Sequence, residues 1–483
     1  MTLGAGRDLG WWRAFGYLCL AVWVLGGAFF LGYSALAVLY PYPLDYTEGS
    51  VLYQVRLLAQ GVQTYQPLEK DPQFIIAYPP VWSYLLAALY PLTGLGLWPG
   101  RLLAILAAMV SAYLLGRMVV GETGDREGGL VSGLLFLSIP YVLATSSLNR
   151  SDAWALLMSL LGVFAVWKVQ GRGPGMVLSL LFFLLAGYTR QSNLLAGPLA
   201  AYGWLFLRGE RRRAVAWGLG LLAVVVGTFL ALNAWTDGGL FFNTIVAPAD
   251  PYHPAVALAW VLRVVQGLPV LLGLAAFFFV LCLAERRVGV AWLYLLGAGA
   301  TVLLTGKIGA HVNYLLEFSA ALAWVAGLVW ARLKQEGFGG PLVRALLAGL
   351  LAVQVLSCLA TARGLLPKLW HYGQKVQEGQ TLERWIQGAG GPVLADAALG
   401  YLVLAGQDPI WQPFEHAHLV RLGLWDQEPF LERIRRGEFA LIVVQPDISA
   451  WSWSPEMLEA IEARYEVVTE VAGQQIHAPR PGP

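Results

Sequence analysis

The chain has 483 residues, of which 57% are hydrophobic and only 13% are charged, and it contains 20 Trp and 20 Phe. No water-soluble globular protein of this length needs such a composition, so the sequence predicts a polytopic membrane protein. The net charge of +2 hides an asymmetry. Residues 1–364 hold 23 Lys and Arg against 15 Asp and Glu, about +8, whereas residues 365–483 hold 9 against 15, about −6. Two domains are therefore expected: a transmembrane domain over residues 1–364 and a soluble domain over residues 365–483.

Apolar windows long enough to cross a bilayer, which takes ~20 helical residues, recur along the first domain. The first window is too long for the core of a signal peptide and lacks a small-residue cleavage pattern, so a retained span is expected. The segment 79–93 is short and bracketed by Pro, which favours a re-entrant or surface helix over a twelfth span. The windows are roughly 14–40, 98–119, 129–147, 153–170, 175–189, 192–207, 214–234, 258–284, 289–305, 315–331 and 341–361.

The orientation of these spans follows from the basic loops, because short loops rich in Lys and Arg stay in the cytoplasm. The richest such loop is RGERRR at residues 208–213, followed by residues 285–287 and 331–334. Counting spans from these loops predicts which connections face the opposite, outer side. They are the long first loop 41–80, the turn 149–152, residues 189–191, the loop 235–257, the segment 306–317 and the tail.

The tail has the pattern of a small soluble α/β domain. Three short strands are predicted in PVLADA, FALIVVQPD and YEVVTEVAG, and three helices in GQKVQEGQTLERWIQ, EPFLERIRRGE and SPEMLEAIEARY. Ser454 followed by Pro455 is the clearest helix start. The tail contains no Gly-rich phosphate loop, no metal-ligand spacing and no nucleophile motif, so no chemistry is assigned to it.

The stretch YPLDYTEGSVLY, residues 41–52, brings Asp45 and Glu48 close to the end of the first span. Their spacing of three places both acids on one side of a helix that begins there, near the positive end of its dipole. The residues that follow alternate in the pattern of an amphipathic helix lying on the membrane surface, with Gln54 and Arg56 on the polar side. The alternative for Asp45 is a simple helix cap, which does not account for Glu48.

The order of several motifs resembles the GT-C class of membrane glycosyltransferases, in particular the bacterial branch akin to protein O-mannosyltransferases and the lipid A 4-amino-arabinose transferase. The resemblance covers about residues 14–331, and one departure is that the usual adjacent Asp-Glu pair is here Thr47-Glu48, with Asp45 two positions upstream. The motifs are D-x-x-E-G at 45–49, YPPVWSYLLA at 78–87, PGRLLAIL at 99–106, NRSDAWALL at 149–157, TRQSNLLA at 189–196 and NYLLE at 313–317.

The resemblance implies an all-α GT-C fold with about 11–12 transmembrane helices and an enzyme that transfers a hexosyl or pentosyl group from a polyprenyl-phosphate donor. The acceptor is a lipid, a glycan or a protein, and the site faces the outside of a bacterial plasma membrane. Either Asp45 or Glu48 is expected to be the general base. The reaction is expected to be inverting, so the second acid binds the acceptor or a divalent cation. Nucleic acid is not an expected partner.

Other outer-face residues complete the expected site. Asp152 is a third catalytic candidate, which would receive the acceptor or hold a metal, or would only cap the next helix. The same acids, Asp45, Glu48 and Asp152, are the candidate ligands for Mg or Mn, the one cofactor considered. Cations are needed to neutralise the leaving phosphate. The candidate substrate-binding residues are Tyr78, Arg150, Arg190, Lys307, Asn313, Tyr314 and Glu317.

Three other functions compete with this one. A secondary transporter would use the acids to bind ions, but the spans show no internal repeat and the acids cluster in loops. A polysaccharide polymerase or ligase shares the donor lipids, but its long functional loop usually comes late in the chain. A membrane scaffold for the tail would leave the outer-face acids without a role.

Overall fold

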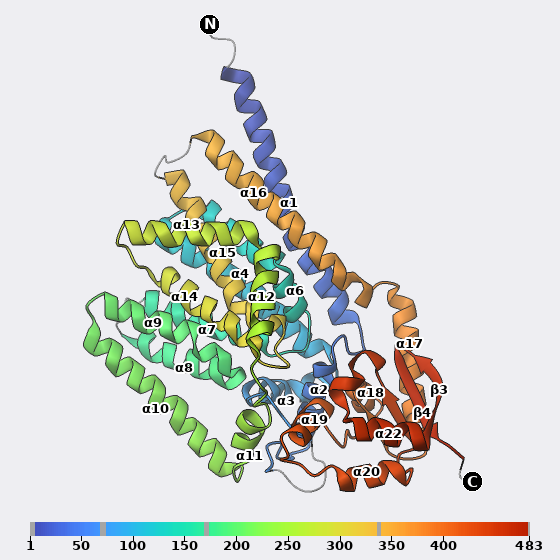
Figure 1. The fold of residues 1–483 in the computed structure, drawn as a ribbon. Helices are drawn as coiled ribbons and strands as arrows, with labels where there is room; N and C mark the ends of the chain where they lie inside the picture. Colours follow the sequence, from blue (N-terminus) through green and yellow to red (C-terminus); the bar gives the residue numbers. More distant parts are fainter. Residues whose placement is uncertain (1–4, 68–73, 169–172, 336–339, 482–483) are drawn as a thin grey trace.

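The fold is seen in a computed structural model, which describes residues 5–67, 74–168, 173–335 and 340–481. Its first part is a bundle of helices (Figure 1). Several helices have Pro in the first turn, where the missing N–H costs no hydrogen bond. The helices of the bundle are α1 (Ala5–Leu39), α2 (Tyr46–Ala59), α3 (Val81–Thr93), α4 (Trp98–Thr123), α5 (Arg126–Ser138), α6 (Pro140–Ser146), α7 (Asp152–Lys168), α8 (Pro174–Thr189), α9 (Ala196–Leu207), α10 (Arg211–Trp235), α11 (Gly239–Phe241), α12 (Pro254–Gly267), α13 (Pro269–Ala284), α14 (Val290–Val302), α15 (Leu316–Gln335) and α16 (Pro341–Ala362).

Every window predicted to span the membrane contains helix. In the described part of the chain, five helices are long and apolar enough to cross a bilayer, and two bent pairs, α5 with α6 and α12 with α13, bring the number to as many as seven. Shorter helices fill the other windows. Helix length and apolar composition alone therefore support fewer spans than the eleven or twelve expected. Helix α3 has 13 residues, a length of about 20 Å, and this is too short to cross the hydrocarbon core.

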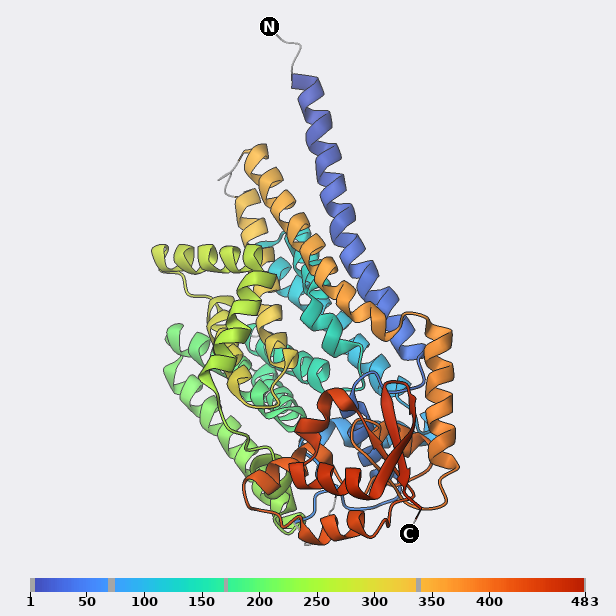
Figure 2. The same cartoon turned by 45° about the vertical axis from the view of Figure 1, so that its right-hand side comes forward.

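Close helix packing in the bundle depends on glycine. A Cβ atom on Gly128 of α5 would lie 2.7 Å from the carbonyl oxygen of Gly327 on α15, and one on Gly327 would lie 2.6 Å from that of Gly128. Only glycine allows the two backbones to approach so closely, as is common where membrane helices cross. Helices α1 and α16 run side by side along one flank of the bundle (Figures 1 and 2).

Helix α2 does not expose its polar side to water, contrary to what the prediction of a helix on the membrane surface implied. Its polar residues Gln54 and Arg56 are buried. Arg56 donates hydrogen bonds to the carbonyls of Val403 (3.2 Å) and Gln407 (2.6 Å) in the C-terminal segment. The expectation that this polar side faces water was wrong, because the local pattern of the helix does not show that the tail packs against it.

The C-terminal segment contains a four-stranded sheet with the order β1-β2-β4-β3. Strands β1 and β2 are parallel, and the other neighbours are antiparallel. The predicted start of α22 is confirmed, because the Ser454 hydroxyl accepts a hydrogen bond from the Met457 N–H (3.2 Å). The elements are α17 (Tyr372–Gln387), β1 (Val393–Ala395), α18 (Leu399–Leu404), α19 (Pro413–Arg421), α20 (Glu428–Arg435), β2 (Leu441–Val444), α21 (Ser449–Ser452), α22 (Pro455–Arg464), β3 (Tyr465–Val471) and β4 (Gln474–Pro479). The three predicted strands and three predicted helices are all present.

Connections that the sequence placed on one face do meet at one end of the molecule. The C-terminal segment lies at the end that carries α2, α3 and α11, away from the N-terminus of α1 (Figures 1 and 2). The loop before α12 pairs with the loop after α14, because the His253 N–H donates to the carbonyl of Gly306 (2.7 Å) and the Ile308 N–H to that of Pro251 (3.0 Å). Which compartment this end faces stays a prediction.

Candidate active site

Glu48 and Arg101 form a fully buried ion pair below the candidate site, and both side chains have 0% exposure. Arg101 donates from Nε to Glu48 Oε1 (2.8 Å) and from Nη2 to Oε2 (2.7 Å). The backbone N–H groups of Leu44 and Asn149 also donate to this carboxylate, each at 2.7 Å. Arg101 further donates to the carbonyls that end α1. The pair therefore fastens α1, α2, α4 and the turn before α7 to one another.

This geometry argues against Glu48 as the general base. Both carboxylate oxygens are occupied, and no path leads from solvent to a side chain with no exposed surface. Glu48 was expected to be a base, an acceptor ligand or a metal ligand, and its contacts support a positioning role instead. Arg101 was visible in the PGRLLAIL motif, but a partner 53 residues away cannot be identified from sequence.

Asp45 is the acid that remains accessible, with 25% of its side chain exposed. Its carboxylate caps α2 by accepting the N–H of Thr47 (3.0 Å), as the alternative prediction proposed. It also faces the guanidinium of Arg150 at 3.5 Å and lines a cavity of about 380 Å³. Burial alone would raise the pKa of Asp45, but Arg150 and the Thr47 hydroxyl outweigh it and lower the pKa below the ordinary value. Asp45 is therefore ionised at neutral pH.

Asp152 lies at the centre of a cationic network that the sequence predicted only as a set of outer-face residues. Its Oδ2 accepts from Arg150 Nε (3.0 Å), and its Oδ1 pairs with Arg190 and accepts from Asn313 Nδ2 (3.2 Å). Residues from three separate connections thus converge. The two arginines share this buried carboxylate, and Arg150 also faces Asp45, so the network pairs two guanidinium groups with two acids at the edge of the adjacent cavities.

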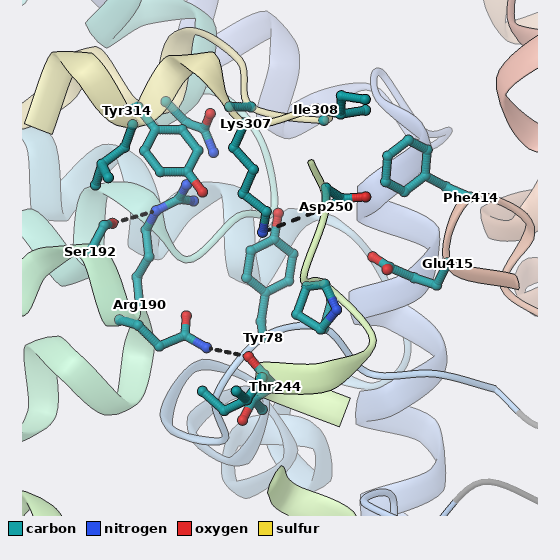
Figure 3. Close-up of a pocket in the computed structure, with 18 of the residues that line it drawn as sticks. Tyr78, Arg190, Ser192, Thr244, Asp250, Lys307, Ile308, Tyr314, Phe414 and Glu415 are labelled. Carbon is teal, nitrogen blue, oxygen red and sulfur yellow. Dashed lines mark hydrogen bonds and ion pairs between the residues drawn. The ribbon is translucent and has the colours of Figure 1, made fainter. Parts of the chain in front are cut away.

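A cavity of about 570 Å³ lies beside this network. It shares walls with the cavity that Asp45 lines, and both contain Tyr46, Tyr78 and Phe414. Arg190 and Tyr314 lie on one side of the cavity, Phe414 and Glu415 on the other, and Lys307 and Asp250 between them (Figure 3). The predicted residues that line the larger cavity are Tyr78, Arg190, Lys307, Asn313 and Tyr314.

Two aromatic rings lie against the guanidinium of Arg190. The Arg190 guanidinium carbon lies 4.6 Å from the ring centre of Tyr314 and 6.0 Å from that of Tyr78, distances at which cation and ring attract.

Glu317 lies deeper, where it accepts a hydrogen bond from the Ser159 hydroxyl (2.9 Å) and lines only a small internal space with Asp152 and Arg190. Its place behind the network supports a positioning role rather than direct contact with a substrate in the larger cavity.

The C-terminal segment supplies part of the cavity wall, which the sequence did not predict. Phe414 and Glu415, in the first turn of α19, line the larger cavity, and Glu415 has only 6% exposure. Phe414 packs on Gly309, where a Cβ atom would lie 2.9 Å from the ring and where φ is +77°. Gly309 is thus needed both for its backbone conformation and for space. No local motif marks Glu415, because its place depends on how the tail docks.

Burial, reinforced by the charge of Asp250, raises the pKa of Glu415 to about 8, while Lys307 opposes the shift. The folded state therefore binds this proton more tightly than the unfolded state, and the resulting stability is lost as pH rises from about 4.5 to 8. We expect Glu415→Gln to raise the melting temperature relative to wild type by an amount that grows between pH 5 and pH 9. Circular dichroism of the detergent-solubilised protein measures this. Glu459→Gln, at an exposed site, should show no such trend, and a constant difference for Glu415→Gln would contradict the assignment.

The acids do not assemble a metal site in the described residues, where no group of three or more His, Cys, Asp or Glu side chains could hold an ion. Asp45, Glu48 and Asp152 each face a guanidinium group instead of one another. The arrangement of these donors does not fit the Mg or Mn considered from the sequence.

Comparisons with known proteins bear on the family and the fold. The family model described as dolichyl-phosphate-mannose-protein mannosyltransferase matches residues 77–235. A comparison with curated protein sequences finds no match. The fold is similar to that of ArnT from Cupriavidus metallidurans bound to undecaprenyl phosphate, with a TM-score of 0.65, 15% identity and coverage of 97% of this chain and 98% of that chain. The Archaeoglobus fulgidus oligosaccharyltransferase, with Zn and sulfate, has a TM-score of 0.51 at 12% identity, over 95% of this chain and 73% of that chain.

The chain therefore has the fold of the GT-C class of membrane glycosyltransferases, and the prediction of that fold is confirmed. Within the class, the similarity to ArnT extends over nearly the full length of both chains, including the C-terminal segment.

Proposed function

We propose that this protein is a glycosyltransferase that moves one hexosyl or pentosyl group from a polyprenyl-phosphate carrier to an acceptor at the outer face of a bacterial plasma membrane. The observation that carries the proposal is the convergence of an accessible carboxylate, Asp45, with the cations Arg150, Arg190 and Lys307 on two adjoining cavities. A displacement at a sugar carbon needs these two features side by side, a base for the acceptor and positive charge for the leaving phosphate.

The proposed reaction is a single displacement. The acceptor, with a hydroxyl or amine on a lipid, glycan or protein, enters the cavity that Asp45 lines and attacks the anomeric carbon. Its O–H or N–H proton passes to the Asp45 carboxylate as the new bond forms. The bond from the anomeric carbon to the phosphate oxygen breaks, and polyprenyl phosphate leaves with both electrons. One displacement inverts the anomeric configuration.

The leaving phosphate is assigned to the larger cavity. Arg190 and Lys307 both line it, and Lys307 is held only loosely by Asp250 at 3.7 Å, so its ammonium group is available to an incoming anion. A planar guanidinium can bind two phosphate oxygens at once.

The isoprene chain needs an apolar groove next to the phosphate. An apolar recess of about 190 Å³ lies between α3 and the end of α10 and is lined by Tyr84, Leu232 and Trp235 among others. Its wall contacts the wall of the larger cavity, because the Tyr65 hydroxyl donates to the carbonyl of Tyr78 (2.7 Å). We assign the first isoprene units to this recess.

Loss of Arg190 tests the phosphate assignment. We expect Arg190→Ala to lower kcat/KM for the donor by about 10²-fold, because one preorganised contact to the developing negative charge is removed. Arg190→Lys should recover part of the loss by restoring the charge without the planar geometry. Arg208→Ala is the matched control, since Arg208 also lies over an aromatic ring (Trp204, 4.8 Å) but does not line the cavity. Equal rates for the Arg190 and Arg208 variants would contradict the assignment.

The activity itself is tested with purified protein in proteoliposomes. Radiolabelled polyprenyl-phosphate sugars are supplied together with a bacterial membrane lipid and glycan extract. Transfer of label with stoichiometric release of polyprenyl phosphate is the expected result. Ion flux that does not depend on any sugar donor, with no transfer, would instead support the transporter.

A further inference from the structure

Glu415 is a buried carboxyl group whose Oε2 atom has no hydrogen-bond partner among the described residues. Leaving such a group unpaired in a protein interior is costly, and folded proteins rarely do it. The side chain points from α19 towards the larger cavity, beside Phe414 and Asp250 (Figure 3). An unpaired polar atom in the wall of a cavity indicates that a ligand completes it.

The usual role of a glutamate at this helix position is already taken. Gln412 caps α19, and its side chain accepts the N–H of Glu415 (2.8 Å). A glutamate three residues after the cap commonly reaches back to the N–H of the capping residue. Here Nδ1 of His416 lies 3.2 Å from that backbone nitrogen and 2.8 Å from the carbonyl oxygen of the same residue, so the imidazole occupies the place that the carboxyl would take. Glu415 is therefore not needed to cap its own helix, and its carboxyl stays in the cavity.

The larger cavity has a polarity that matches a sugar phosphate. Arg190 at one side and Lys307 in the middle offer positive charge, and at the other side Phe414 offers a flat apolar ring next to the carboxyl of Glu415. Burial and Asp250 raise the pKa of Glu415 to about 8, so at neutral pH the group can both donate and accept a hydrogen bond. A phosphate bound at the cations would direct its sugar ring, with its hydroxyl groups, towards Glu415.

We propose that Glu415, supplied by the C-terminal segment, binds a hydroxyl group of the donor's sugar ring and thereby determines which sugar the enzyme accepts. This inference rests on the proposed function. It gives the C-terminal segment a direct part in substrate recognition, although its sequence carries no catalytic motif. Glu415 does not touch the reacting bond in this assignment, and it acts on specificity.

The test compares wild type, Glu415→Ala and Glu415→Gln as full-length proteins, with Glu459→Ala as the control on the exposed surface of the same segment. The probes are polyprenyl-phosphate monosaccharides and, for the sugar that wild type prefers, each of its mono-deoxy analogues. A site that hydrogen-bonds a hydroxyl discriminates strongly against the analogue that lacks it. We expect one deoxy analogue to lose about 10- to 100-fold in kcat/KM with wild type and Glu459→Ala.

With Glu415→Ala this penalty should disappear for that analogue alone, while the penalties for the other analogues remain. Glu415→Gln keeps the shape and should show an intermediate penalty. Equal loss of activity of Glu415→Ala with every analogue, or a preserved penalty for each, would overturn the inference while leaving the glycosyltransferase activity intact. Absence of transfer by wild type with every donor would overturn the proposed function and this inference together.

Discussion

Asp45→Asn is expected to reduce sugar transfer by about 10²- to 10⁴-fold, the range lost when a general base is removed. The substitution is informative because Asn caps helices as well as Asp does. The hydrogen bond from the Thr47 N–H to the side chain (3.0 Å) can thus be retained while the charge and the basic oxygen are lost. The melting temperature should change little, and the initial rate of label transfer is the measurement.

The matched control for this substitution is Asp125→Asn. Asp125 also caps a helix, α5, by accepting the N–H of Glu127 (3.3 Å), but it does not line either cavity. Its variant should transfer sugar at the wild-type rate. If Asp45→Asn kept more than about a tenth of the wild-type rate, the loss would be smaller than the least expected on removing a base. Asp45 could then not be the base.

Glu48→Gln is expected to destabilise the protein more than it affects any single chemical step. It leaves the Arg101 guanidinium buried without its counter-charge, which costs about 3–5 kcal/mol. We expect a large drop in melting temperature and in the yield of monodisperse protein. The double variant Glu48→Gln/Arg101→Met should recover part of the stability, because the unpaired charge is removed. Size-exclusion chromatography and thermal unfolding in detergent provide both readouts.

The outcome also separates two roles for Glu48. A folded Glu48→Gln protein with an unchanged melting temperature that transfers no sugar would support Glu48 as the catalytic base. Low stability of the single variant and recovery in the double variant would show that the Glu48–Arg101 ion pair stabilises the fold around Asp45.

The sequence was sufficient for the class of fold and for most of the cationic side of the site. Apolar windows and basic loops can be recognised in a sequence because each residue has its own free energy of transfer from water into the membrane. They placed Asp45, Arg150, Arg190 and Lys307 on one face, and these residues do meet at adjoining cavities. The resemblance of the motifs supplied the expected reaction class, which composition alone does not indicate.

What could not be predicted depends on contacts between distant segments. Glu48 and Arg101 both stand in motifs of the sequence, but only the folded chain shows that they form an ion pair with each other. The polar side of α2 meets the tail through Arg56 instead of water. The sequence around Glu415 contains no motif, because its place in the cavity wall comes from the docking of α19 over the loop that contains Gly309.

The most direct test of the proposed site is an experimental structure of the protein in lipid nanodiscs with bound polyprenyl phosphate. The phosphate is predicted to lie in the larger cavity within hydrogen-bonding distance of Arg190 and Lys307, with the first isoprene units entering the recess beside α3. A phosphate bound at the other end of the bundle, near the basic loop 208–213, would contradict the account.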